Sequence, residues 1–213
     1  MANGREIKQI YDAMKRICSE SSQMLKVIRD NFDEKSFKCL NASKVMWDTS
    51  KAIDDGTYWL PYFQQLLFVP KDQIAPKKAL GVNILFDEPG GGIDNVIPFV
   101  TCGLLSWEKG STEKTSNHLW GAGWWDGDEP PRPKTTFSPP LYRTVFAKSG
   151  NDCEKITYYL LPLDELKSEN TVVSLIVKPL LDLYKGEDEK VRSAVRSVAI
   201  TLEEVKGEPV AGE

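Results

Sequence analysis

The segment from Gly4 to Glu34 constrains the fold of this chain more than any other part of its sequence. Apolar side chains recur there at alternating steps of three and four residues, and neither Pro nor Gly interrupts the interior of the segment. The stripe consists of Ile7, Ile10, Met14, Ile17, Met24 and Ile28, and it is widened by Tyr11, Cys18, Leu25 and Phe32. Such spacing places these side chains on one face of an α-helix. The pattern therefore predicts one long amphipathic helix.

Two interpretations of this helix follow from the stripe. In the first, the helix lies across a sheet of its own domain and its apolar face is buried there. The residues expected to be buried are Ile10, Met14, Ile17, Leu25 and Ile28. In the second, the stripe pairs with that of another copy and forms a homodimer through the N-terminal helix. The first is favoured, because Ser21 stands in the middle of the stripe, where a coiled coil would place an apolar residue.

The middle of the chain has the alternating pattern of β-strands. The strongest signal covers residues 80–86, and residues 96–107 return after a Gly-rich break to make a hairpin. Both faces of residues 63–69 are largely apolar, which predicts a strand in the centre of a sheet. The clear predicted strands are residues 58–69, 80–86, 96–107, 142–148 and 155–163.

Helical periodicity returns near the C-terminus. Residues 171–184 are expected to form a helix that Pro179 kinks or divides, whereas residues 187–205 fit either a helix or a strand. Helices at the ends and consecutive strands in the middle predict an α+β fold. We expect an antiparallel sheet of about five strands, packed by the long N-terminal helix and by C-terminal helices. Residues 1–205 are expected to form a single domain and residues 206–213 a flexible tail.

The composition argues against several classes of protein. A net charge of −4 makes nucleic acid an unexpected partner, and no uncharged apolar run approaches the roughly 18 residues that cross a bilayer. The four cysteines are scattered and His118 is the single histidine, so no zinc-binding set of usual spacing can be written. Scattered cysteines and the lack of a readable signal peptide predict a cytoplasmic protein that does not enter a membrane.

The most unusual segment covers residues 108–140, which are rich in Gly, Pro, Ser and Thr and contain three of the six tryptophans. Its aromatic and acidic residues are Trp120, Trp124, Trp125, Asp126 and Asp128. Flat rings beside carboxylates are suited to stacking on a base, a sugar or a cationic ligand, which identifies these five residues as a candidate ligand-binding site. The alternative is a structural plug, in which the tryptophans close one end of the core.

No catalytic residue and no metal site can be assigned from the sequence, and no cofactor is expected. We therefore predict a non-enzymatic ligand-binding or regulatory interaction module that uses the aromatic and acidic loop, with a small molecule or a protein as its partner. The alternative is a divalent-metal-dependent hydrolase or nuclease with Asp and Glu ligands, for which Asp152, Glu165 and Lys167 are the candidates.

Each hypothesis predicts a different surface. A metal enzyme needs at least two carboxylates in one concave pocket. A binding module needs an aromatic-lined groove. An oligomerising protein needs an apolar patch along the first helix.

Overall fold

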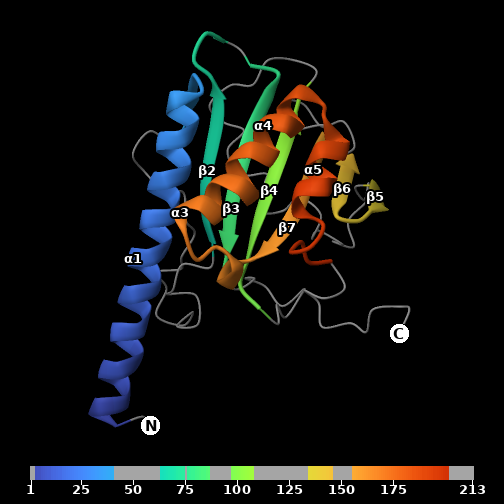
Figure 1. Ribbon diagram of the computed structural model, residues 1–213. Helices are drawn as coiled ribbons and strands as arrows, with labels where there is room; N and C mark the ends of the chain where they lie inside the picture. The colour runs from blue at the N-terminus through green and yellow to red at the C-terminus, as the bar shows by residue number, and fades with distance from the viewer. Residues whose placement is uncertain are drawn as a thin grey trace, which may run out of the picture.

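A computed structural model describes residues 3–40, 63–74, 76–86, 97–107, 134–145 and 155–201. These residues form one antiparallel sheet with a long N-terminal helix and a set of C-terminal helices (Figure 1). The strands are β1 (Phe37–Cys39), β2 (Phe63–Pro70), β3 (Lys78–Leu85), β4 (Phe99–Ser106), β5 (Lys134–Ser138), β6 (Leu141–Val145) and β7 (Lys155–Pro162). Their order in the sheet is β1-β2-β3-β4-β7-β6-β5. The predicted α+β class is confirmed.

The helical elements lie at the two ends of the described chain. They are α1 (Gly4–Glu34), the 3₁₀ turn η3 (Leu163–Glu165), α3 (Glu169–Val172), the π-helical segment η4 (Val173–Val177), α4 (Lys178–Lys185) and α5 (Asp188–Val195). Residues 187–205, which fit either a helix or a strand by sequence, begin with helix α5. Val191 and Val195 lie one helical turn apart and both are buried, as on the inner face of a helix. Figure 1 shows α3, α4 and α5 in front of the sheet and α1 along its side.

The predicted hairpin of residues 80–86 and 96–107 is confirmed as the pair β3 and β4, in which Gly81 faces Gly103 across the two strands. The last two predicted strands are β6 and β7, which also pair. Strand β5 was not predicted, because five residues between prolines are too short to show an alternating pattern. Its strand conformation comes from antiparallel pairing with β6.

Both faces of the central strands are apolar and buried, as the pattern of residues 63–69 predicts. The face beneath the C-terminal helices carries Leu66, Phe68, Leu80, Val82, Ile84, Val100, Cys102, Leu104, Tyr159 and Leu161. The opposite face carries Phe63, Leu67, Val69, Ala79, Leu85, Phe99, Leu105, Tyr142, Ile156, Tyr158 and Leu160. Strands buried on both faces read as continuous apolar runs rather than as alternating ones.

Helix α1 begins at a capping box. The Asn3 side chain accepts hydrogen bonds from the amides of Arg5 and Glu6, and the Glu6 carboxylate accepts one from the Asn3 amide at 2.8 Å. These bonds satisfy amide groups that have no partner within the helix itself. The predicted extent of the helix is confirmed.

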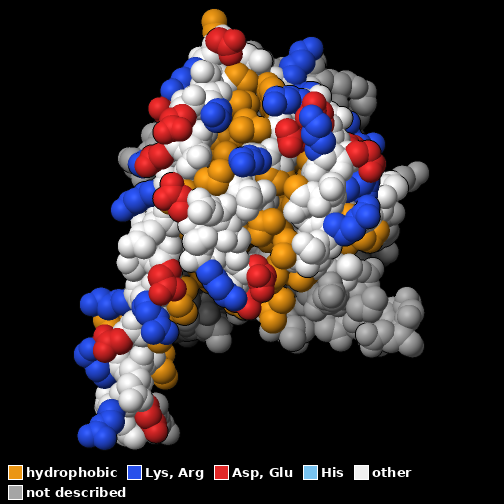
Figure 2. Space-filling model, viewed as in Figure 1, with side chains coloured by type: hydrophobic (Ala, Val, Ile, Leu, Met, Phe, Trp, Pro, Cys, Tyr) orange, Lys and Arg blue, Asp and Glu red, His pale blue; other side chains and the backbone are white. Residues whose placement is uncertain are grey.

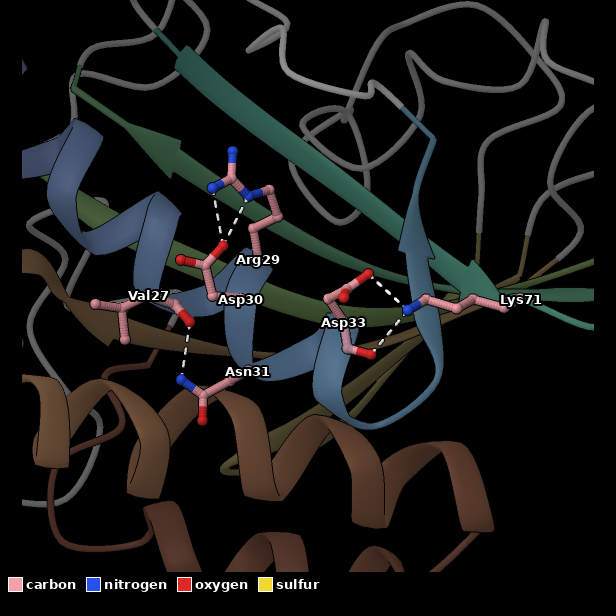
Figure 3. Close-up of polar contacts among 6 residues, drawn as sticks. All are labelled: Val27, Arg29, Asp30, Asn31, Asp33 and Lys71. Atoms are coloured by element: carbon pink, nitrogen blue, oxygen red, sulfur yellow. Dashed lines mark hydrogen bonds and ion pairs between the residues drawn. The ribbon is translucent and has the colours of Figure 1, made fainter.

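The C-terminal half of α1 is clamped against the body of the protein, where it contacts β1, α3 and η4. Phe32 is fully buried and stacks on Phe68 of β2 with ring centroids 4.5 Å apart. At the surface, the Lys71 Nζ atom lies 2.7 Å from the Asp33 carboxylate and donates to the Asp33 carbonyl at 3.0 Å (Figure 3). A cation beside the last turn of a helix is also attracted to the negative end of the helix dipole. Helix and sheet are thereby joined at one end of α1.

The N-terminal half of α1 corrects the predicted burial. Leu25 and Ile28 are buried as expected and Met14 is half-buried, but Ile10 is 59% exposed and Ile17 is 43% exposed. The physical reason is length, because α1 extends beyond the sheet and the C-terminal helices (Figure 1). Periodicity identifies the apolar face of a helix but does not say how far a covering layer reaches along it.

Pro179, which was predicted to kink or divide the helix of residues 171–184, does not divide it. Elements α3, η4 and α4 follow one another without a break, and the π-helical segment η4 directly precedes the turn that contains Pro179. Proline has no amide hydrogen to offer the Leu175 carbonyl, which lies four residues earlier. The Tyr159 hydroxyl of β7 donates to that carbonyl at 2.9 Å. A buried side chain of the sheet thus supplies the donor that the helix lacks.

We expect Tyr159→Phe to lower the free energy of unfolding by about 1–3 kcal/mol, because it leaves the Leu175 carbonyl without this donor. Tyr158→Phe is the matched control. Tyr158 is equally buried, and its hydroxyl has no hydrogen-bond partner of good geometry in the described part of the chain. Urea denaturation of both variants measures the difference, and equal losses would contradict the role assigned to Tyr159.

Candidate functional site

The five loop residues predicted to bind a ligand lie outside the described residues. They are Trp120, Trp124, Trp125, Asp126 and Asp128. Their assignment as a ligand-binding site, and the alternative of a structural plug, both stay predictions.

The metal-enzyme alternative stays a prediction, because only two of its three candidate residues lie within the described ranges. Glu165 closes the turn η3 after β7, and both Glu165 and Lys167 are exposed. Asp152 lies outside the described residues. Within the described ranges, no group of three or more His, Cys, Asp or Glu side chains is placed to hold a metal ion.

The exposed apolar face of α1 is the first candidate site. We call it the α1 stripe, and it consists of Ile7, Ile10, Tyr11, Met14, Ile17 and Cys18. Ile7 is 58% exposed and Tyr11 is 55% exposed, in addition to the two isoleucines given above. Each member has another member three or four residues away, so they line one side of the helix. The stripe continues without a change of face into the buried residues Leu25 and Ile28.

Charged residues occupy the flanks and the far side of the same helix. Lys8 forms an ion pair with Asp12, and Arg16 lies 3.9 Å from Glu20. The Lys15 ammonium lies 5.3 Å from the centre of the Tyr11 ring. Figure 2 shows this mixture of charged and apolar side chains on the projecting end of α1. Exposed pairs one turn apart support a helix in water, although each contributes little to stability.

An apolar groove begins where the α1 stripe reaches the body. We call it the α1 groove, and it is lined by Ile17, Met24, Ile97, Pro98, Leu163 and Leu166. Ser21 and two acidic residues, Glu20 and Asp164, complete its lining. Ile17 belongs to both features, so the stripe and the groove form one continuous apolar surface. The surface is therefore longer than the exposed face of the helix alone.

A buried polar pair on the sheet is the second candidate site. Asn83 of β3 and Thr101 of β4 are directly opposite each other and have no exposed surface. Neither amide atom of Asn83, nor the Thr101 hydroxyl, has a hydrogen-bond partner among the residues that the structure describes. A buried polar group without a partner costs about 1–3 kcal/mol, so such groups call for an explanation.

Two glycines lie beside this polar pair in the sheet. Gly81 and Gly103 occupy the next positions on the same face of β3 and β4, and Tyr158 follows on β7. Burial raises the pKa of the Tyr158 hydroxyl well above its ordinary value, and the nearby Thr144 hydroxyl offsets only part of that rise. The hydroxyl is therefore protonated at all physiological pH values. The arrangement is polar but not acidic, and it contains no nucleophile activated by a base.

Comparisons with known protein families, curated proteins and solved structures find no match for this chain. Among the described residues, no helix combines the length and the apolar character needed to cross a membrane.

Sequence reasoning found the α1 stripe but expected the protein's own sheet to cover most of it. It did not single out Asn83 and Thr101, although each is a polar residue on an otherwise apolar face of a predicted strand. Asn83 lies opposite Thr101 because of the register between β3 and β4. One polar residue in each strand is not enough to predict that register.

We expect Asn83→Leu to raise the free energy of unfolding by about 1–2 kcal/mol, because leucine has the same branched shape as asparagine and leaves no amide group unpaired. Thr101→Val tests the neighbouring hydroxyl in the same way. Denaturant unfolding of the full chain measures both changes. A loss of stability in either variant would show that the polar group has a partner in solution.

Proposed function

We propose that this chain is a non-enzymatic interaction module that binds another protein helix through the α1 stripe. The observation that carries the proposal is the alignment of exposed isoleucines on one face of a helix that extends beyond its own core. Single exposed apolar residues are common on soluble proteins, whereas aligned ones mark interaction surfaces.

The energetics favour a partner that covers more than the stripe. Burying what remains exposed of Ile7, Ile10 and Ile17 contributes roughly 2–5 kcal/mol, at about 1.5–3 kcal/mol for each complete side chain. Association itself costs an estimated 4–15 kcal/mol in lost freedom of motion. Contact with the adjacent α1 groove supplies further apolar area. A helix lying along α1 and reaching the groove would cover both features.

The charges around the stripe favour a protein partner over a lipid surface. Residues 4–20 contain four basic and three acidic side chains, and the two kinds alternate along the helix. A helix that lies on an anionic membrane instead carries mainly Lys and Arg on its polar face. Mixed charges are typical of helices that select a protein partner by charge pairing.

The aromatic and acidic loop keeps its predicted role within this proposal. Trp120, Trp124, Trp125, Asp126 and Asp128 are the residues that we propose to bind a small molecule or a further protein segment. The combination of rings and carboxylates supports this role, because both kinds of group are used in recognition without any catalytic partner. A loop ligand and a helix partner would engage different parts of the chain.

The proposal is tested by placing a photo-crosslinking amino acid at Ile10 of the full chain, in cells that naturally produce the protein. Ser19 is the matched control, because it is exposed on the opposite side of the same helix. We expect Ile10 to crosslink to protein and Ser19 to give at least about tenfold less product, because only the stripe is covered by the partner. Mass spectrometry of the products identifies the partner.

Equal labelling at Ile10 and Ser19, or labelling of lipid alone at Ile10, would contradict a protein-binding role for the stripe.

A further inference from the structure

We propose that the sheet face opposite the C-terminal helices binds a small neutral molecule that carries an amide group on a flat body. The floor of this site is the backbone of Gly81 and Gly103, and its polar wall is the pair of Asn83 and Thr101. We call it the glycine-floor site. The inference goes beyond the proposed function, because it uses residues of β3 and β4 and none of the α1 stripe.

Four positions of β3 and β4 form a rectangle in the middle of the sheet (Figure 1). Gly81 lies opposite Gly103, and Asn83 lies opposite Thr101. Val82 stands between two of them and points beneath the C-terminal helices, so its neighbours point to the other face. Paired strands are about 4.8 Å apart, and alternate residues of one strand are about 6.6 Å apart. The rectangle is therefore comparable in size to one aromatic ring.

The polar wall is the feature that points to a ligand. The Asn83 and Thr101 side chains are fully buried, and three of their atoms, the two amide atoms and the hydroxyl oxygen, have no hydrogen-bond partner within the described part of the chain. Buried polar groups in proteins are paired with protein, with water or with a bound molecule. Groups that weaken the empty fold are typical of positions kept for binding rather than for stability.

The two glycines leave the floor without side chains. Glycine inside a strand weakens the strand, and it marks places where a ligand or another backbone approaches closely. Gly81 and Gly103 lie within regular antiparallel pairing, and the described glycine with a positive φ is Gly186. Backbone conformation therefore does not account for the glycine pair. Close approach of a flat molecule to the backbone does.

Large side chains border the floor on its other sides. Leu67 of β2 lies opposite Gly81, and Tyr158 of β7 lies opposite Gly103. Leu105 follows Gly103 on the same face of β4. The site thus has one polar wall and three walls made of leucine side chains and a tyrosine ring. A ligand that fits it has a polar group at one end and an apolar ring over the floor.

The polar wall also selects the chemical class of the ligand. Asn83 presents an N–H donor beside a carbonyl acceptor, and an amide presents the complementary acceptor and donor. The Thr101 hydroxyl offers a third hydrogen bond. On this face β2, β3, β4 and β7 carry no charged side chain. An ion would lose its hydration there without gaining a counter-charge, so the ligand is neutral.

Benzamide is the probe that tests the site, because it joins an amide to a flat ring. Acetophenone has the same shape without the N–H donors, and benzoate has the same shape with a negative charge. Heteronuclear NMR of the isotope-labelled full chain follows the backbone amides of Gly81 and Gly103 and the side-chain amide of Asn83. We expect benzamide to shift these signals with a dissociation constant of about 10 mM or lower. Acetophenone should bind at least about tenfold more weakly, and benzoate should not shift them.

Two substitutions remove the polar wall and keep the floor. We expect Asn83→Leu to weaken benzamide binding at least about tenfold, and Thr101→Val at least about threefold, because each removes hydrogen bonds to the ligand. Thr157→Val is the matched control. Thr157 is a buried threonine of β7 that lies opposite Leu104, on the face beneath the C-terminal helices. It should change the dissociation constant less than about twofold. Circular dichroism checks that each variant is folded.

The outcomes decide between a binding site and a polar pair without a ligand. Benzamide shifts at Gly81 and Gly103 that Asn83→Leu abolishes would support the site. Equal affinity for benzamide and acetophenone would overturn the amide class. If Asn83→Leu stabilises the chain but benzamide does not bind the wild-type protein, the site itself is overturned. None of these results changes the expected crosslinking at Ile10, so the proposed function is tested separately.

Discussion

The rest of this structure depends on the rigidity of one continuous helix, α1. An α-helix keeps one direction along its whole length, because backbone hydrogen bonds join each turn to the next. The burial of Ile28 and Phe32 fixes the C-terminal half of α1 beside β1, α3 and η4. The N-terminal half then extends beyond the body (Figure 1), and Ile7, Ile10 and Ile17 on its apolar face are exposed. The same face of the helix is thus core at one end and exposed to solvent at the other.

That anchoring depends on how the C-terminal helices are held on the sheet. Helix α1 packs against η4, and η4 lies directly before Pro179 in a continuous helical run. Pro179 has no amide hydrogen for the Leu175 carbonyl, and the Tyr159 hydroxyl donates to that carbonyl instead. Burial, together with the neighbouring Cys102, raises the pKa of Tyr159 well above its ordinary value, so the hydroxyl stays protonated and remains a donor. A hydrogen bond between β7 and η4 therefore supports the helical segment against which α1 packs.

Two features of the described residues bear on the proposed function. The α1 stripe is an apolar surface of a kind that proteins bury against other proteins. The buried pair of Asn83 and Thr101 is a polar feature inside an apolar layer, and it contains no group that titrates near neutral pH. The α1 groove beside the stripe is lined by two carboxylates, Glu20 and Asp164, whereas the pair of Asn83 and Thr101 is not acidic. The exposed apolar face of α1 is the patch that the oligomerising hypothesis expects, and that hypothesis stays a prediction.

The sequence by itself determined the extent of α1, the α+β class and the β3–β4 hairpin, because these depend on local periodicity and turn residues. It also located the apolar stripe, which is the part of the candidate site that could be predicted. Only the tertiary structure decided that Ile10 and Ile17 face solvent while Leu25 and Ile28 face the core. The same holds for β5 and for the pairing of Asn83 with Thr101, which arise from neighbouring strands. Periodicity tells which side of an element is apolar, whereas the layer that covers it comes from residues distant in the chain.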